Sequence, residues 1–505
     1  MTTTDRSRPP SQDDGRGDDG PRSAPLEIIV RLVERLERAD VGYCHWKSNE
    51  AIARSESGEN DLDLLVARDD AGRFAEVLHN LGFRAARPAA DRQLPGIVDY
   101  YGLDEPTGGV VHVHAHYRLV LGDDMTKNFH LPLEDHYLRS ASREGLLRLP
   151  SPEFEYVLFV LRMVLKHSPW DSQLDRKGRL TPSERRELGY LSARIRPAEV
   201  ERLVDAHLPF VGRRLFASCV SACSGGSGRA ARAVTAMRLT ACLGAHARRP
   251  PAVDLMLRAW RRRWRKAQAR LPGSSGKKRL DTGGYVVAVV GGDGAGKSSA
   301  VDHLVKMLSH DLRVYRSHLG KPPRSRMSRY LKRSMQRLQD RGMLASTTLP
   351  AWHEFGGKSP GAPYLLWHTL TARDRYLEYR RIRRASLRGE VVVCDRWPTP
   401  RVQLMDGPRG RALSGLRTRP LARWIAAREA AYYAHIRPPD LLVVLKVSPE
   451  VAIARRPDQD PDFVRRRAQE VHQADWAGPG VRVVDADAPA DEVLTEVTRA
   501  VWDSL

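Results

Sequence analysis

The stretch of the chain with the clearest chemistry is a glycine-rich octapeptide, Gly291-Gly292-Asp293-Gly294-Ala295-Gly296-Lys297-Ser298. An apolar run precedes it and an amphipathic stretch follows, so we expect a strand, a tight loop and a helix. Glycines let consecutive backbone N–H groups face a phosphate, and the helix N-terminus adds positive potential. Lys297 can bridge the β- and γ-oxygens of a triphosphate, and the Ser298 hydroxyl can hold Mg²⁺. The octapeptide and Ser299 therefore predict a binding site for ATP and Mg²⁺.

Two charged residues, Asp395 and Arg396, follow a second apolar run, residues 391–394. Ligands of open α/β sheets bind at the carboxyl ends of parallel strands, where this pair is expected to lie. Asp395 can organise the Mg²⁺ shell, and Arg396 can form two parallel hydrogen bonds to a phosphate. The alternative is an ion pair that only caps the strand.

Near the N-terminus, Asp61 and Asp63 alternate along a predicted strand. Side chains recur on one face of a strand at every second residue, so the two carboxylates share a face and suit Mg²⁺. His112, His114 and His116 alternate in the same way on a later strand. A zinc site is conceivable there, but three histidines on one strand seldom converge on one ion. We interpret them as hydrogen-bonded or solvated side chains.

The elements that must position these residues form two α/β domains. Strands apolar on both faces alternate with helices in the second domain, which is typical of a parallel sheet with helices on both faces. In chain order we expect a disordered tail (1–24), a first α/β domain (25–150), a helical extension (151–250), a basic linker (251–283) and the second α/β domain (284–505).

Composition agrees with a multidomain globular protein. The 505 residues include 83 basic and 61 acidic side chains, a formal net charge of +22, and 41% are apolar. No apolar run approaches the ~18 residues that span a bilayer, and we expect a cytoplasmic protein. Basic residues gather at 258–279, with Trp260 and Trp264 among them, and at 313–341. They predict weak contact of the linker with nucleic acid or an anionic membrane, with a solvated helix as the alternative.

The motifs of the second domain, taken in order, resemble the thymidylate kinase family of P-loop nucleoside monophosphate kinases. The arginine-rich stretch 455–467 falls where that family has its lid. The other matching segments are 293–298, Ala372-Arg373-Asp374-Arg375, Asp395-Arg396-Trp397, Pro439-Asp440-Leu441-Leu442, Ser448-Pro449-Glu450-Val451-Ala452 and Val483-Val484-Asp485-Ala486.

This resemblance implies transfer of the γ-phosphoryl group of ATP to a nucleoside monophosphate, and dTMP is the acceptor that it favours. It assigns the ATP phosphates and Mg²⁺ to Lys297 and Ser298, the acceptor sugar to Asp293, the acceptor base to Arg375, the acceptor phosphate to Arg396, and the transferring phosphoryl group to Arg455 and Arg456. Phosphoryl transfer depends mainly on positioning and positive charge, which agrees with such a set.

Three departures bear on the acceptor. Val290 stands where the family has an acidic residue, Thr371 stands at its base-stacking aromatic position, and residues 321–360 are long and basic. Trp367, one turn before Thr371, is either the stacking residue or a core residue. The alternatives to dTMP are a sugar or glycan-precursor acceptor and an ATP-binding scaffold with little turnover.

The first domain resembles the nucleotidyltransferase superfamily through residues 58–66, with Trp46-Lys47-Ser48 upstream and residues 111–114 downstream. His112 occupies the place of that superfamily's third carboxylate, and Asp99 is the less favoured substitute. The resemblance implies either nucleotidyl transfer or a degenerate, substrate-binding domain. The expected partners are nucleotide substrates and, in a homodimer, a second copy of the chain.

Overall fold

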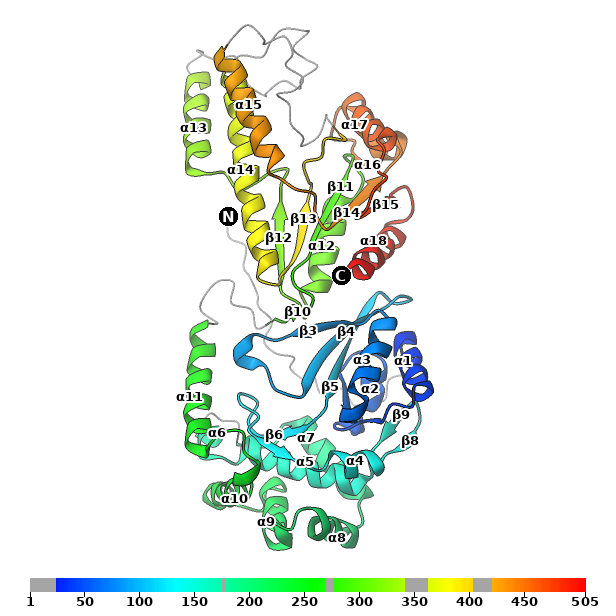
Figure 1. The fold of residues 1–505 in the computed structure, drawn as a ribbon, viewed down its shortest axis with the longest axis vertical. Coiled ribbons are helices and arrows are strands. Elements are labelled where there is room, and N and C mark those ends of the chain that lie inside the picture. Colours follow the sequence, from blue (N-terminus) through cyan, green and yellow to red (C-terminus); the bar gives the residue numbers. More distant parts are fainter. Residues whose placement is uncertain (1–23, 175–177, 269–276, 341–361, 403–419) are drawn as a thin grey trace. The chain divides into compact units, whose positions relative to one another are not determined.

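The apolar run before the glycine-rich loop is the middle strand of a parallel sheet in the computed structural model (Figure 1). The structure describes residues 24–174, 178–268, 277–340, 362–402 and 420–505. The predicted tail lies almost entirely outside these residues, and so does much of the 321–360 stretch. The first of two compact units contains the described residues up to Ala85 and from Ala90 to Gln268, and the second contains Ala86–Ala89 and those from Lys277 on.

The second unit is built on five parallel strands in the order β12-β13-β11-β14-β15. Its elements are β10 (Arg279–Leu280), β11 (Val286–Gly291), α12 (Lys297–Leu308), β12 (Val314–His318), α13 (Arg326–Asp340), α14 (Ala362–Leu387), β13 (Val391–Asp395), α15 (Pro420–Ala434), β14 (Leu441–Lys446), α16 (Pro449–Arg455), α17 (Pro461–Gln473), β15 (Val481–Asp485) and α18 (Ala490–Ser504).

Strand β11 explains why this sheet is buried on both faces. Val286, Ala288 and Val290 pack in one core cluster with Tyr379 and Ile382 of α14. The residues between them, Val287 and Val289, point to the other face and are also fully buried. Helix α12 contacts β11 and β13. The predicted two-sided strand is therefore confirmed.

The first unit contains a mixed sheet in the order β1-β2-β5-β4-β3, in which β2 and β5 are parallel and β4 and β5 antiparallel. Its elements before the helical region are α1 (Glu27–Arg38), β1 (Tyr43–His45), α2 (Ile52–Glu56), β2 (Leu62–Val66), α3 (Ala71–Asn80), β3 (Arg84–Arg87), β4 (Ile97–Asp104), β5 (Gly109–His116), β6 (Leu119–Leu121), β7 (Phe129–Leu131), α4 (Glu134–Arg139), β8 (Ser142–Glu144) and β9 (Leu147–Leu149).

The helical region that follows packs around α5, which is buried on nearly all sides. Ser151 caps this helix by accepting a hydrogen bond from the backbone N–H of Phe154 at 3.4 Å, and proline occupies its first position. One apolar cluster joins α5 to Trp46 and Leu65 at the sheet. The helices are α5 (Pro152–His167), α6 (Trp170–Leu174), α7 (Pro182–Arg194), α8 (Pro197–His207), α9 (Gly212–Cys223), α10 (Arg229–Cys242) and α11 (Pro251–Gln268).

Helix α11 corrects part of the predicted basic linker. The first eighteen residues of that linker, 251–268, form a helix that belongs to the first compact unit, and two of its arginines form ion pairs there. Arg258 pairs with Asp171 at 3.2 Å, and Arg262 pairs with Asp171 at 2.9 Å and with Asp123. Partners of opposite charge, Asp171 and the buried Asp123, thus hold this stretch, whose composition is that of a linker. Among the described residues, no helix combines the length and the apolar character needed to cross a bilayer.

Candidate functional site

The glycine-rich loop connects the carboxyl end of β11 to the first turn of α12, which begins at Lys297. Gly294 and Gly296 both have φ of +82°, a left-handed conformation that side chains rarely adopt. A Cβ on Gly294 would also lie 2.8 Å from the carbonyl oxygen of Ala452. Glycine is therefore required at this position for two separate reasons, and the loop has the strand, turn and helix order predicted from the sequence.

Asp395 comes to the loop because β13 pairs in parallel with β11, with Asp395 opposite Val289. The Ser298 hydroxyl donates to its Oδ2 at 3.3 Å. Its Oδ1 is buried and has no hydrogen-bond partner among the described residues. An unsatisfied buried carboxylate oxygen is costly unless something binds it. A hydroxyl and a carboxylate oxygen suit Mg²⁺, so Ser298 and Asp395 could hold that ion.

Lys297 is almost fully buried, and its ammonium donates to the carbonyl oxygen of Gly292. Burial and the nearby Arg396 lower the pKa of Lys297 to about 8. The phosphates of a bound nucleotide would stabilise the protonated amine against both effects.

Asp293 joins two arginines that come from different elements. Arg396 Nη2 lies 3.2 Å from its Oδ1, and Arg467 Nη1, in α17, lies 2.6 Å from its Oδ2. Burial alone would raise the pKa of Asp293, but Arg467 and Lys297 outweigh burial and lower it. Arg396 is predictable from the sequence and Arg467 is not, because residues 455–467 include several arginines and nothing local marks the one that reaches Asp293.

Asp293, Arg396, Lys297 and Asp395 line a cavity of about 400 Å³. The lid arginines also line it: Arg455 donates to the Ala486 carbonyl oxygen at 2.7 Å, and Arg456 pairs with Asp458 at 3.0 Å. Its lining residues are Asp293, Gly294, Gly296, Lys297, Ser298, Ser299, His318, Lys321, Asp395, Arg396, Arg455, Arg456 and Gln459. His318, Lys321 and Gln459 are additions to the residues predicted from the sequence.

The two residues expected at the acceptor base lie outside this lining. Arg375 donates to the carbonyl oxygens of Leu319 at 2.8 Å and Gly320 at 3.3 Å, and to the Tyr433 hydroxyl. The guanidinium of Arg324 lies 4.6 Å from the ring centre of Trp367. Arg375 and Trp367 therefore have partners within the protein.

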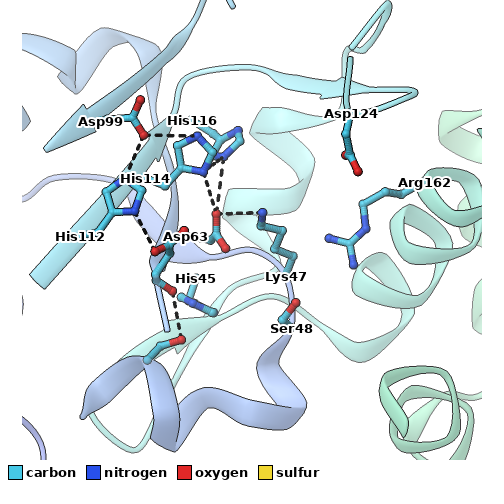
Figure 2. A network of polar contacts seen from close by, with 12 residues as sticks. His45, Lys47, Ser48, Asp63, Asp99, His112, His114, His116, Asp124 and Arg162 are labelled. Atoms are coloured by element: carbon cyan, nitrogen blue, oxygen red, sulfur yellow. Dashed lines mark hydrogen bonds and ion pairs between the residues drawn. The ribbon is translucent and has the colours of Figure 1, made fainter. Parts of the chain in front are cut away.

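In the first unit, three histidines of β5 and three carboxylates form one polar network (Figure 2). His112 lies between Asp61 and Asp99, with 2.8 Å from each ring nitrogen to the nearest carboxylate oxygen. Asp99 reaches this position because β4 runs antiparallel to β5 and places it opposite His114. The two aspartates predicted to share one ion thus contact different histidines, because Asp61 faces His112 and Asp63 faces His114.

Asp63 is the buried centre of the other half of this network. Its Oδ1 lies 2.9 Å from Lys47 Nζ and 3.1 Å from His114 Nδ1. Burial alone would raise the pKa of Asp63, but Lys47 and the hydrogen bonds of His114 and His116 hold it well below its usual range. Burial lowers the pKa of His116 to about 3, so its imidazole is neutral.

Known proteins are similar to less than half of this chain in the comparisons that follow. No family model matches it. The ATP-binding protein YghR of Escherichia coli K12 is 28% identical over 228 residues, which is 43% of this chain and 86% of YghR. YghS of the same strain, also an ATP-binding protein, is 25% identical over 224 residues, 44% of this chain and 93% of YghS. The thymidylate kinase of Symbiobacterium thermophilum is 28% identical over 228 residues, 43% of this chain and 93% of the kinase.

These similarities support a P-loop kinase-like region in the chain. They agree with the parallel sheet and the phosphate-binding loop of the second unit. They lend no support to the nucleotidyltransferase resemblance of the first unit, which stays a prediction. Together the loop geometry and these relatives support an ATP-binding, kinase-like region in this chain.

Proposed function

We propose that the second unit transfers the γ-phosphoryl group of ATP, with Mg²⁺, to a phosphorylated acceptor, and that dTMP is the first candidate. The observation that carries this proposal is the contact of the Asp395 carboxylate with the glycine-rich loop. Its Oδ2 accepts from Ser298, and its Oδ1 is buried without a partner among the described residues. When bound, Mg²⁺ would neutralise charge between the β- and γ-phosphates.

The charge of the cavity favours transfer over simple ATP storage. Five basic side chains, Lys297, Lys321, Arg396, Arg455 and Arg456, line it together with two carboxylates, Asp293 and Asp395. This leaves a formal excess of three positive charges in one cavity. A complex of ATP with Mg²⁺ has about two negative charges, so a further anionic group would be accommodated. The phosphate of an acceptor is such a group.

Arg396 is the side chain best placed to bind that phosphate. It lies at the carboxyl end of β13, next to the loop, and it is held by Asp293 at 3.2 Å. A guanidinium offers paired donors that match phosphate oxygens. Arg467, on α17, pairs with the other carboxylate oxygen of Asp293. Arg467 would thus hold the Asp293 carboxylate in place, and Asp293 would position the Arg396 guanidinium.

A second candidate is a phosphorylated acceptor without a nucleobase, such as a phosphosugar. The observation that favours it is the pairing of the expected base-binding residues inside the protein. Arg375 is bound to two carbonyl oxygens and a tyrosine. Thr371 is buried and accepts from Arg324 at 3.0 Å, and the same guanidinium lies over Trp367. A thymine ring would have to displace these contacts.

The experiment that tests the proposal measures acceptor-dependent ADP release by the whole chain. The protein is incubated with ATP, Mg²⁺ and single acceptors, first dTMP, then other nucleoside monophosphates and phosphosugars. Lys297→Ala should lower turnover by ~10³-fold or more, because it removes the charge that contacts the transferring group. Lys306→Ala, an exposed change in the same helix, is the matched control.

The acceptor profile decides between the candidates. Turnover with dTMP that Lys297→Ala abolishes would establish the nucleotide reading. Turnover with phosphosugars alone would select the second candidate. ATP binding without turnover on any acceptor would contradict phosphoryl transfer and favour an ATP-binding scaffold.

A further inference from the structure

Three potential metal ligands of the first unit converge on one point, and the proposed kinase function does not involve them. Asp63 Oδ1 lies 3.1 Å from His114 Nδ1, and His114 Nδ1 lies 3.2 Å from His116 Nε2. The third side of the triangle, from His116 Nε2 to Asp63 Oδ1, is 3.7 Å. Figure 2 shows the two rings and the carboxylate directed toward one another.

Hydrogen bonds alone do not satisfy this triangle well. Each imidazole nitrogen has either one proton or one lone pair. His114 Nδ1 can therefore form one good hydrogen bond, with Asp63 or with His116, although it lies within 3.2 Å of both. At the far side of its ring, His116 Nδ1 is buried without a partner among the described residues. His114 Nδ1 therefore cannot form a full hydrogen bond with both of its close neighbours.

A metal ion would satisfy all three atoms together. Ligand atoms bound tetrahedrally at about 2.0–2.1 Å lie about 3.3–3.4 Å from one another. The three observed separations, 3.1, 3.2 and 3.7 Å, fall on either side of that value. Two imidazoles and one carboxylate are also a donor set that suits divalent ions of the first transition row, whereas Mg²⁺ prefers oxygen ligands throughout.

The surroundings orient the ligands. His114 Nε2 lies 3.8 Å from Asp99 Oδ1, on the side of the ring away from the triangle. A carboxylate behind a ligating histidine commonly fixes its ring and raises its basicity. His112 is held between Asp61 and Asp99 and so is not a fourth ligand. It instead keeps Asp99 in place.

We propose that Asp63, His114 and His116 bind one divalent transition-metal ion of the zinc class. The site differs from the Mg²⁺ pair that the spacing of Asp61 and Asp63 predicted, because β5 supplies imidazoles and Asp61 faces His112. Three protein ligands leave a tetrahedral position for water or for an oxygen atom of a bound molecule. Lys47, 2.9 Å from the same carboxylate oxygen, balances its charge when no metal is bound.

The test uses untagged, full-length protein that has been treated with a chelator and dialysed. Co²⁺ is the probe, because its visible absorption reports the number and type of its ligands. We expect one Co²⁺ per chain, with the strong visible bands of a low-coordinate site, displaced by equimolar Zn²⁺ and retained in millimolar Mg²⁺. His114→Ala and His116→Ala should weaken binding by ~10²-fold or more.

The matched control is His130→Ala. His130 lies on β7 in the same unit and pairs with a single carboxylate, Glu134, at 2.8 Å. It should leave Co²⁺ binding unchanged. If the alanine variants fail to fold, as judged by circular dichroism, Asp63→Asn and His116→Gln give the answer with smaller changes of shape. Three results would overturn the proposal: no stoichiometric Co²⁺ in the wild type, unchanged affinity in the ligand variants, or displacement by millimolar Mg²⁺.

Discussion

Arg396 combines a functional position with an unfavourable backbone conformation. Its φ is +67°, in the left-handed region that costs a residue with a Cβ ~1–2 kcal/mol. The neighbouring Trp397 is buried, and its ring centre lies 6.0 Å from that of Tyr379. This packing anchors the chain directly after Arg396. The geometry therefore aims the guanidinium at Asp293 at a cost in stability.

That cost leads to a prediction about two variants. Arg396→Gly and Arg396→Ala should both lose phosphoryl transfer, because both lack the guanidinium. The glycine variant should nevertheless be more stable than the alanine variant by about 1 kcal/mol, since only glycine adopts this φ without strain. Urea unfolding monitored by tryptophan fluorescence measures the difference. An alanine variant at least as stable as the glycine variant would show that the turn is not strained.

The lowered pKa of Lys297 makes ATP affinity depend on pH. Without nucleotide, burial and Arg396 bring this pKa to about 8, so the amine loses its proton as pH rises through 8. ATP binds the protonated form, and its phosphates are already ionised at these pH values. Affinity should therefore fall above pH 8, by about tenfold per pH unit, with proton uptake on binding.

Isothermal titration in buffers of different ionisation enthalpy measures this uptake. Lys306→Ala should keep the dependence on pH, and Lys297→Ala should lose it along with most of the affinity. Equal affinity at pH 7 and pH 9 in the wild type would contradict the assignment.

The position of the glycine-rich loop depends on how closely β11 approaches β14. A Cβ on Gly291 would lie 2.6 Å from the carbonyl oxygen of Leu445, the residue opposite it in the register. Backbone atoms cannot move aside as a flexible side chain can. Gly291→Ala should therefore destabilise the second unit by ~1–3 kcal/mol and weaken ATP binding.

The same substitution at Gly189, in the middle of α7, is the control. A Cβ there meets nothing within 4 Å, and alanine suits a helix better than glycine. Gly189→Ala should leave stability unchanged or slightly raised. If the Gly291→Ala variant had the melting temperature and the ATP affinity of the wild type, β14 would have to move aside to accommodate the added Cβ.

Local patterns explain which elements could be predicted from the sequence. The loop, its strand and its helix were predictable because residues 286–298 specify them without distant partners. Asp395 was predictable because a carboxylate at the end of a buried parallel strand must lie near that loop. Residues 251–268 have the composition of a basic linker, but they form helix α11, in which two arginines pair with Asp123 and Asp171 far away in the chain.

The contacts that the sequence does not predict depend on the register of paired strands or join residues far apart in the sequence. The sequence offers Asp99 only as the less favoured substitute for a third carboxylate, and the antiparallel pairing of β4 with β5 brings it beside His112 and His114. Arg467 reaches Asp293 across 174 positions in the sequence. No local pattern of apolar residues specifies either distance.

Each candidate site belongs to one compact unit. The apolar clusters of the first unit draw on residues from Ile28 to Leu243, and the cluster beneath the ATP site draws on Val286 to Trp476. No residue is shared between the two sites. A lesion in one should therefore leave ligand binding at the other unchanged.

Ligand-dependent unfolding of the full chain tests this independence. A ligand that binds only a folded site raises stability by about 2.7 kcal/mol at a hundred times its Kd. In a thermal scan, ATP with Mg²⁺ should shift one transition and Zn²⁺ another. Lys297→Ala should remove only the ATP shift, and His116→Ala only the Zn²⁺ shift. If either ligand moved both transitions, or either variant lost both shifts, the units would be coupled, and the metal site would then have to be examined as a regulator of phosphoryl transfer.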